Sequence, residues 1–387
     1  MIPAGWKEAR LSDLATIRRG AGSQYLNYVE QPEDGIRLIR IGDFLGNDPV
    51  YVQHSRHIER FILTAGDILI AGTGATAGIV FEVPDEFEGL AFSYNAPLIQ
   101  VADQASKRYI YYVLTSNLVK RQQEALFTGN AQPFLDTKAI GGFRIPLPKR
   151  EERIRIAEVL ETWDRAIETV EALIANARAQ KQALMQQLLP HGTTPPRKRL
   201  PGFSGEWREG RLGSLADISK GEQKGRASLS GEGPVPVING GTTPSGYTDH
   251  PNTAANTITI SEGGNSCGHV DLITQPFWCG GHCYALKNLK VDRDYLFAVL
   301  KHRQPEIMSL RVGSGLPNIQ KKALSQFSIP VPARPEQVKI GELAACADKE
   351  IAALEAQLTA LRQEKAALMQ QLLTGRRRVK FPESEVA

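Results

Sequence analysis

The sequence has few cysteines and no long apolar run. Four cysteines in 387 residues, all in the second half, are too few and too unevenly placed for a disulfide framework. No apolar stretch approaches the roughly 20 residues that a helix needs to cross a bilayer. The first residues also lack the charged-then-apolar pattern of a signal peptide. We therefore expect a soluble, cytoplasmic protein.

The composition is that of a globular protein. Hydrophobic residues make up 42% and charged residues 23% of the chain, which excludes disorder of the whole chain. The length predicts two or three domains, at roughly 100–200 residues each. The net charge of +4 permits a polyanionic partner but does not require one.

The chain repeats itself at long range. The segment ALMQQLL occurs at residues 183–189 and again at 367–373, an offset of 184 residues. The same offset aligns residues 145–148 (IPLP) with 329–332 (IPVP). Near the start of each half, an offset of 201 aligns the segments that begin at Trp6 and Trp207. Because solenoid repeats have periods of about 20–50 residues, this offset indicates two similar modules in tandem.

Each half ends in a run that predicts a long helix. Apolar residues recur at alternating spacings of four and three over residues 156–188 and 340–372, interrupted only at Lys181 and Lys365. This pattern is typical of coiled coils, although two ordinary core helices would also be compatible with it. At 1.5 Å per residue, each 33-residue run spans about 50 Å. The predicted packing face comprises Ile167, Val170, Ile174, Leu184, Leu188, Ile351, Leu354, Leu358, Leu368 and Leu372.

The rest of each half has a mixed α/β pattern. Strands are expected within residues 35–41, 67–71, 96–101, 235–238, 256–260 and 282–286, and one helix in each half, at residues 107–128 and 292–311. Glycine-rich and polar turns separate the expected strands. The predicted fold class is α+β, with two similar mixed modules and two long helices. The domain boundaries are 1–148 (first module), 149–189 (first helix), 190–206 (linker), 207–332 (second module), 333–374 (second helix) and 375–387 (tail).

This layout resembles the specificity (S) subunit of type I restriction–modification systems. The resemblance lies in residues 6–20, 145–189, 199–207 and 329–375, and so extends over essentially the whole chain. Glu336, Gln337 and Ile340 are similar to the family's helix-opening "EQ..I" signature. The first copy, which begins Glu151-Glu152-Arg153, is a looser version of it.

The resemblance implies a DNA-reading subunit without catalytic activity. Each module would be a target recognition domain that reads one half of a bipartite, asymmetric DNA sequence. The two helices would form an antiparallel coiled coil, giving a pseudo-twofold repeat that docks two methyltransferase subunits, and restriction subunits can join that core. No cofactor is expected in this chain, because S-adenosylmethionine, ATP and Mg would be bound by the partner subunits.

Two other function classes are open. A self-contained adenine methyltransferase needs an Asn/Asp-Pro-Pro-aromatic motif to hold a flipped base, but residues 95–98 (NAPL) lack the second proline and the aromatic ring. The glycine-rich residues 72–78 are not followed by Lys-Ser/Thr, as a phosphate-binding loop would be. A scaffold that binds only proteins is the second alternative, and a gel-shift assay on duplex DNA with partner subunits would discriminate it.

A cluster of cysteines and histidines raises the question of a zinc site. Zinc-ligand residue types gather over 17 residues, at Cys267, His269, Cys279, His282 and Cys283. Their spacing is irregular, and His282 and Cys283 adjoin on an expected strand, where neighbouring side chains point to opposite faces. We therefore expect no metal site here, but buried thiols and polar histidines.

Candidate DNA contacts are basic, amide and hydroxyl side chains on loops beside the strands. Arginine and glutamine can bind guanine and adenine edges with two hydrogen bonds, whereas lysine and small polar residues more often bind phosphate. The candidates in the first module are Arg18, Arg19, Gln24, Thr73, Thr76, Asn130 and Gln132. Those in the second are Lys220, Gln223, Lys224, Arg226, Asn239, Thr242, Asn265, Ser314, Asn318 and Lys321.

The helix length predicts the spacing between the two half-sites. Modules at the ends of antiparallel helices about 50 Å long would read half-sites roughly one DNA turn apart, about 34–36 Å, allowing for the inward reach of each module. A spacer of several base pairs would then lie unread between them.

Overall fold

The structure, a computed structural model, describes residues 3–127, 133–190, 196–313 and 315–380. The chain divides into two compact units, and each is described by itself. Unit 1 comprises residues 1–169 and 359–387, and unit 2 comprises residues 170–358. Each unit therefore contains one predicted module together with about half of each long helix. No helix among the described residues is long and apolar enough to span a membrane.

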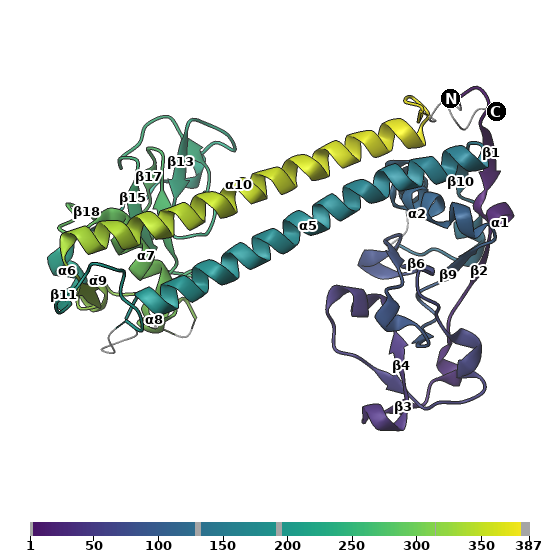
Figure 1. Ribbon diagram of the computed structural model, residues 1–387, viewed down its shortest axis with the longest axis horizontal. Coiled ribbons are helices and arrows are strands. Elements are labelled where there is room, and N and C mark those ends of the chain that lie inside the picture. The colour runs from purple at the N-terminus through teal and green to yellow at the C-terminus, as the bar shows by residue number, and fades with distance from the viewer. Residues whose placement is uncertain (1–2, 128–132, 191–195, 314, 381–387) are drawn as a thin grey trace. The chain divides into compact units, whose positions relative to one another are not determined.

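Unit 1 contains three antiparallel or mixed sheets (Figure 1). Their orders are β1-β10, β2-β9-β6-β7 and β3-β5-β4-β8, the last with a parallel β4–β8 pair. The predicted strands at residues 35–41, 67–71 and 96–101 are confirmed as β4, β6 and β9. The strands are β1 (Lys7–Arg10), β2 (Ala15–Arg18), β3 (Tyr28–Val29), β4 (Ile36–Ile39), β5 (Tyr51–Val52), β6 (Ile68–Ile70), β7 (Val80–Glu82), β8 (Ala91–Phe92), β9 (Leu98–Val101) and β10 (Arg144–Leu147).

The helix expected at residues 107–128 is broken, so that prediction was wrong in detail. Two helices, α2 (Lys107–Thr115) and α3 (Asn117–Phe127), flank Ser116, whose backbone is extended. The Ser116 hydroxyl donates to the carbonyl of Val113, which competes with continuation of the helix. Two shorter helices, α1 (Leu11–Leu14) and α4 (Thr137–Gly141), also belong to unit 1.

Unit 2 repeats this plan with differences in detail. Its sheets have the orders β11-β19, β12-β18-β15-β16 and β14-β13-β17, and the three strands predicted from the second half are confirmed as β13, β15 and β18. The strands are β11 (Arg208–Arg211), β12 (Asp217–Lys220), β13 (Val235–Ile238), β14 (Tyr247–Thr248), β15 (Thr257–Ser261), β16 (Val270–Ile273), β17 (Trp278–Cys279), β18 (Cys283–Lys287) and β19 (Ser328–Val331).

The helix expected at residues 292–311 is also broken in two. Arg303 caps the end of helix α7 (Arg293–His302). Helix α8 (Gln304–Ser309) has Pro305 in its first turn, and this residue has no N–H to continue the α7 hydrogen-bond ladder. Helices α6 (Leu212–Leu215) and α9 (Lys321–Ser325) complete the short helices of unit 2. Short 3-10 helices occur at Ser23–Tyr25, Pro32–Asp34, Ile41–Leu45, Ile58–Phe61, Gly74–Thr76, Asp85–Phe87 and Gln104–Ser106 in unit 1 and at Arg226–Ser228 in unit 2.

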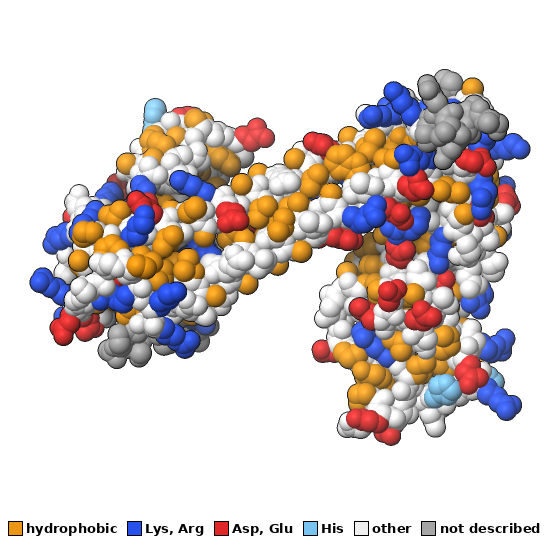
Figure 2. All heavy atoms as spheres, viewed as in Figure 1, with side chains coloured by type: hydrophobic (Ala, Val, Ile, Leu, Met, Phe, Trp, Pro, Cys, Tyr) orange, Lys and Arg blue, Asp and Glu red, His pale blue; other side chains and the backbone are white. Residues whose placement is uncertain are grey.

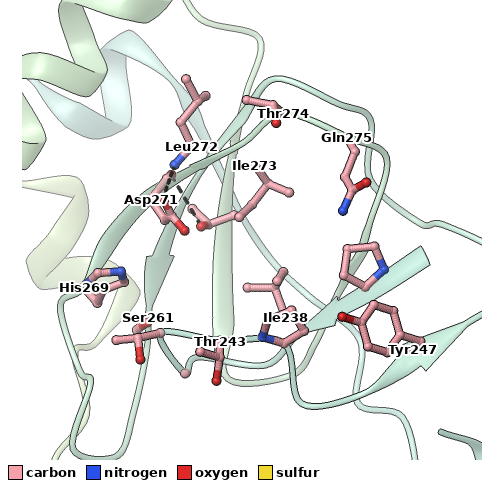
Figure 3. A pocket seen from close by; sticks show the side chains of 15 residues that line it. Ile238, Thr243, Tyr247, Ser261, His269, Asp271, Leu272, Ile273, Thr274 and Gln275 are labelled. Atoms are coloured by element: carbon pink, nitrogen blue, oxygen red, sulfur yellow. Dashed lines mark hydrogen bonds between the residues drawn. The ribbon is translucent and has the colours of Figure 1, made fainter. Parts of the chain in front are cut away.

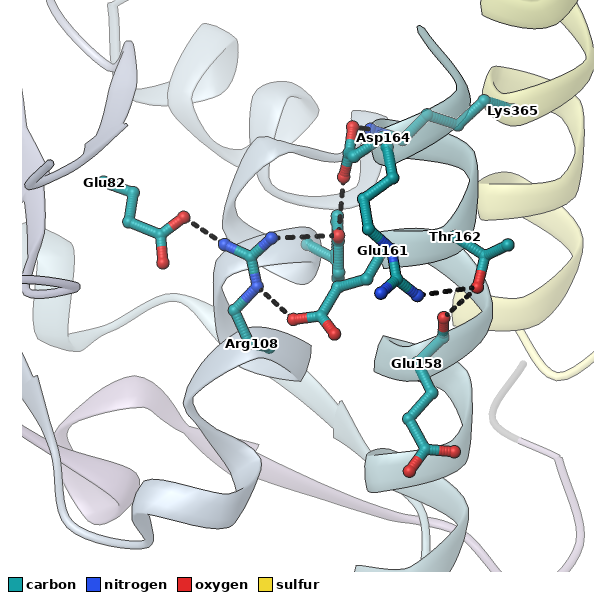
Figure 4. Close-up of polar contacts among 9 residues, drawn as sticks. Glu82, Arg108, Glu158, Glu161, Thr162, Asp164 and Lys365 are labelled. Atoms are coloured by element: carbon teal, nitrogen blue, oxygen red, sulfur yellow. Dashed lines mark hydrogen bonds and ion pairs between the residues drawn. The ribbon is translucent and has the colours of Figure 1, made fainter. Parts of the chain in front are cut away.

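The two long helices are confirmed as α5 (Arg150–Leu188) and α10 (Arg334–Leu373). Within each unit they run antiparallel and are joined by ion pairs. In unit 1, Lys365 of α10 pairs with Asp164 of α5, in the polar network of Figure 4. In unit 2, Lys181 of α5 pairs with Asp348 of α10. The two lysines that interrupt the apolar pattern thus pair with an aspartate of the facing helix. Each pair compensates the charge of a lysine that lies in the packing face between the helices.

The helix ends belong to the cores of the modules. The start of α5 contributes Ile156 and Leu160 to the core of unit 1, together with Leu372 at the end of α10. The end of α5 contributes Leu188 to the core of unit 2, together with Ile340 near the start of α10. Of the ten predicted packing residues none is exposed, and four are buried, namely Val170, Ile174, Leu188 and Leu372.

The start of each long helix is held by the same three residue types. In unit 1, buried Glu152 accepts hydrogen bonds from the Trp6 indole at 3.1 Å and from Arg378 at 2.8 Å. In unit 2, buried Glu336 accepts from Arg199 at 2.8 Å, and Arg199 lies over the Trp207 ring. The glutamate of each helix-opening motif is therefore a buried anchor for the segment that follows the other long helix.

Candidate nucleic-acid interface

The predicted DNA contacts of unit 1 lie on loops that adjoin the β2-β9-β6-β7 sheet. Arg18 ends β2 and Arg19 follows it, while Gln24 is exposed in the 3-10 helix Ser23–Tyr25. Thr73 and Thr76 are half-buried at the turn after β6. Asn130 and Gln132 lie outside the described residues.

The guanidinium of Arg19 lies over two aromatic rings. Its guanidinium carbon is 4.3 Å from the centre of the Tyr94 ring and 5.3 Å from that of Phe134. These rings are 46% and 49% exposed. Nη1 of Arg19 is buried and has no hydrogen-bond partner. Phe134 also forms a β-bridge with Thr73, so the structure brings two predicted residues, Arg19 and Thr73, to the same cluster.

Gly20 allows the loop that carries Tyr94 to approach β2. A Cβ atom at Gly20 would lie 2.2 Å from the carbonyl oxygen of Phe92, so only glycine fits without a shift of the backbone. Next to it, the Ala21 N–H donates to the Phe92 carbonyl at 2.8 Å and the Tyr94 N–H donates to the Ala21 carbonyl at 3.0 Å. These bonds place the Tyr94 ring beside Arg19.

In unit 2, Lys220 ends β12 and binds a carboxylate. Lys220 Nζ is 2.5 Å from Glu262 Oε1, and the hydroxyl of Tyr284 donates to the same oxygen at 3.1 Å. His282 Nδ1 lies 3.7 Å from the other oxygen of Glu262. Burial raises the pKa of Tyr284, and the Glu262 charge raises it further, so the hydroxyl remains a donor. The Glu262 carboxylate is thus the centre of this cluster.

Some of the other predicted residues of unit 2 contact neighbouring residues of the unit, and the rest of those described are exposed. Asn239 Oδ1 accepts a hydrogen bond from the His282 N–H at 3.1 Å. Lys224 Nζ lies 4.1 Å from the centre of the Trp278 ring. Exposed candidates are Gln223, Thr242, Asn265, Asn318 and Lys321. Ser314 and the side chain of Arg226 lie outside the description.

A polar groove of about 240 Å³ adjoins these loops in unit 2 (Figure 3). It is lined by side chains of β13, β15 and β16 and of the loops beside them, among them Thr243, Tyr247, His269, Asp271 and Gln275. Burial lowers the pKa of His269, and the Lys301 charge lowers it further. Sequence reasoning did not single out these residues for DNA, because their convergence depends on pairing between strands far apart in the chain.

The cysteines of the cluster examined for zinc are buried in unit 2. Cys267 donates its Sγ–H to the Glu262 carbonyl at 3.0 Å, and Cys279 donates to the Cys283 carbonyl at 3.5 Å. Their thiols therefore bind backbone oxygens within the core. His269 and His282 are only partly buried or exposed, and they face different neighbours.

Comparison with protein families identifies the chain. The model of the type I restriction modification DNA specificity domain matches residues 3–177 and again residues 204–361. The chain belongs to this family. The two matches cover the two modules and most of the helix that follows each, which confirms the tandem repeat.

Curated relatives carry the same description. A protein of Mycoplasma genitalium named "putative type I specificity subunit" is 36% identical over 127 residues, which is 32% of this chain and 33% of that protein. A Methanocaldococcus jannaschii protein named "putative type I restriction enzyme MjaX specificity subunit" is 25% identical over 98% of this chain and 95% of its own. The match to the Mycoplasma protein spans only about a third of that relative's length.

Solved structures share the fold. The crystal structure of a type I restriction–modification S subunit from M. genitalium has a TM-score of 0.66 at 18% identity, covering 98% of this chain and 97% of that one. A chain from a study of complex assembly in the type I system has a TM-score of 0.56 at 22% identity, covering 96% and 98%. The specificity-subunit architecture, with two mixed modules and two long helices, is therefore that of this chain.

Proposed function

We propose that this specificity subunit reads a bipartite, asymmetric DNA sequence, one half with each unit. The observation that carries the proposal is a repeated framework with different loop chemistry. Arg19 and Lys220 occupy equivalent positions at the ends of β2 and β12, yet Arg19 lies over two aromatic rings and Lys220 binds Glu262. Two readers with one framework and different contacts bind two different short sequences.

The paired grooves along the long helices support docking of two copies of one methyltransferase subunit. In unit 1, a groove of about 490 Å³ is lined by Asp164, Ile167, Arg362, Lys365 and Met369. In unit 2, a groove of about 560 Å³ is lined by the residues 184 positions away, which are Asp348, Ile351, Arg178, Lys181 and Met185. A surface that occurs twice with the same residues binds the same partner twice.

The surfaces of the helices have the character of a docking site. Apolar side chains gather along α10 in unit 1 on the face drawn in Figure 2. Leu173 of α5 is 47% exposed and Val338 of α10 is 37% exposed, although both belong to helices whose other faces are packed. Exposed apolar surface of this kind favours a protein partner. We propose that restriction subunits join the same core.

In this proposal the chain itself is not catalytic. S-adenosylmethionine, ATP and Mg bind to the methyltransferase and restriction subunits, and this chain supplies the DNA target. Its cellular compartment, like that of its partners, is proposed to be the cytoplasm. The candidate residues fit this role, because arginine, amide and hydroxyl side chains on loops are groups that bind base edges and phosphates.

The test is the methylation pattern of cells that carry the chain with the methyltransferase subunits of its own system. We expect one bipartite motif with an unread spacer, which disappears when this chain is deleted. A gel shift of random duplex DNA by the purified complex should select the same motif. A continuous motif, or methylation that is independent of this chain, would contradict the proposal. Assembly with the methyltransferase but no sequence selection would indicate a scaffold instead.

A further inference from the structure

One position has the same place in both units but different chemistry. The segments LATIRRG at residues 14–20 and LADISKG at 215–221 align Arg19 with Lys220. Two places further in each sheet lie β6 and β15, and Gly72 and Glu262 come just after the last residue of these strands. The Gly72 N–H donates to the Asn95 carbonyl, just as the Glu262 N–H donates to that of His282. The residues next to Gly72 and Glu262 form equivalent bridges, Thr73 with Phe134 and Gly263 with Asn318.

In unit 2 the cation at this position is neutralised. Lys220 Nζ lies 2.5 Å from Glu262 Oε1, and Glu262 is largely buried. In unit 1 the equivalent of Glu262 is glycine, so no carboxylate can reach Arg19 from there. Two residues without charge, Tyr94 and Phe134, occupy the space around the guanidinium instead.

The aromatic rings leave the hydrogen-bonding capacity of Arg19 unused. Stacking on a ring face fixes the plane of a guanidinium without consuming any of its five N–H donors. Among the described residues, none accepts a hydrogen bond from Arg19, and Nη1 is buried without a partner. Because both rings are about half exposed, the cluster opens to solvent. Nε and Nη2 are not among the buried atoms without a partner, so the edge of the guanidinium that carries these two nitrogens is the one left for a ligand, and the rings hold its plane in place.

We propose that Arg19 reads a guanine in the half-site bound by unit 1, an inference that rests on the proposed function. Guanine presents O6 and N7 side by side in the major groove and accepts two hydrogen bonds from one guanidinium. A phosphate contact requires only positive charge, which lysine supplies as well, and does not require a fixed plane. The position therefore determines specificity in unit 1, while the Lys220–Glu262 pair of unit 2 cannot present the same planar pair of N–H donors.

The test compares methylation motifs of wild type, R19K and R19Q in cells that carry the methyltransferase subunits. R19K keeps the positive charge but lacks the planar pair of N–H donors. In R19Q, the glutamine side chain can bind adenine, rather than guanine, with two hydrogen bonds. We expect one G·C position in one half of the motif to become degenerate, with a loss of discrimination of roughly 5- to 150-fold. The other half and the spacer should stay unchanged. R121K, at an exposed arginine of α3, is the matched control and should leave the motif intact.

A second variant tests the aromatic rings while Arg19 is kept. The double variant Y94L/F134L frees the guanidinium plane, and we expect it to weaken selection at the same G·C position as R19K. Melting temperatures of the purified variants show whether they fold. If R19Q does not fold, the motif of R19K is the test.

Two outcomes separate this inference from the proposed function. A bipartite wild-type motif that R19K and R19Q leave intact, with methylation lowered uniformly at all sites, would show a phosphate contact and overturn the inference alone. A change in the other half of the motif would also overturn it. A wild-type complex with no bipartite motif would overturn the proposed function, and this inference with it.

Discussion

Arg378 binds Glu152, a residue 226 positions earlier in the chain, through two hydrogen bonds from its guanidinium. Glu152 is buried at the start of α5, and its other contact is the indole N–H of Trp6. The segment after α10 is thereby fixed to the start of α5. Arg199, after α5, makes the same bidentate contact with Glu336 at the start of α10.

This relationship predicts a stability effect for a residue near the end of the chain. R378A would leave a buried carboxylate with one of its partners missing, at a cost of about 1–3 kcal/mol in the free energy of unfolding. R377A is the matched control, because Arg377 is exposed and its side chain has no hydrogen bond or ion pair among the described residues. Urea denaturation of both variants measures the effect. Equal stability of R378A and R377A would show that the pair contributes nothing.

The apolar seam predicts a second stability effect. Ile351 and Leu358 are half-buried on α10 in unit 2, and truncation of buried aliphatic side chains costs about 2–5 kcal/mol when burial is complete. We expect I351A/L358A to lower the free energy of unfolding by about 2–4 kcal/mol in total and to reduce assembly with the methyltransferase before it alters sequence preference. Q357A, on the exposed face of the same turn, is the control. Wild-type melting and assembly of the double variant would refute the seam.

The lowered pKa of His269 predicts a loss of stability in acid. Burial and the Lys301 charge disfavour its protonated form in the folded protein, whereas the unfolded chain binds the proton with a pKa of about 6.5. Above about pH 6.5, His269 therefore leaves the free energy of unfolding unchanged with pH. Below that pH the unfolded chain binds a proton at His269 before the folded protein does, so the free energy of unfolding falls until the pH reaches the pKa of His269 in the folded protein. H269N should lose less stability than wild type between pH 7.5 and 5.0.

The exposed His250 provides the control for this pH dependence. H250N should keep the wild-type loss of stability between the two pH values, measured by urea denaturation. An H269N curve parallel to that of wild type would show that His269 does not contribute.

The long helices predict the length of the unread spacer. One heptad inserted into the middle of both α5 and α10 keeps the apolar seam in register and lengthens each helix by about 10 Å, or about three base pairs. We expect the spacer of the methylated motif to grow accordingly. A heptad inserted into α5 alone should instead abolish assembly, because the facing positions no longer match. An unchanged spacer in a well-assembled double insertion would show that the helices do not set it.

The sequence predicted which segments form helices and strands better than it predicted where helices break and which strands pair. The heptad pattern identified α5 and α10 to within a few residues, because the apolar spacing is regular and, after Gly341 in the second copy, neither run contains proline or glycine. The breaks at Ser116 and Arg303 were missed, since each depends on local hydrogen bonding or on Pro305, which a single helical pattern does not weigh. The pairing of β1 with β10 was not predicted, because it joins Lys7 to Leu147, which are far apart in the chain.

The candidate site was predictable in its basic residues but not in what surrounds them. Arg19 and Lys220 stand out as cations at the end of an expected strand and directly before a glycine. Tyr94, Phe134 and Glu262 could not be assigned to them, because each comes from a loop or strand end more than 40 residues away. The difference between a free guanidinium and a neutralised ammonium is a property of tertiary structure alone.

The exchange of one module tests the central claim most directly. Residues 1–145 would be replaced by the corresponding module of another specificity subunit, and the methylated motif read genome-wide in cells with the methyltransferase subunits. We predict that one half of the bipartite motif changes to that of the donor while the other half and the spacer stay as in wild type. A motif that changes in both halves, or in neither, would contradict independent reading by the two units.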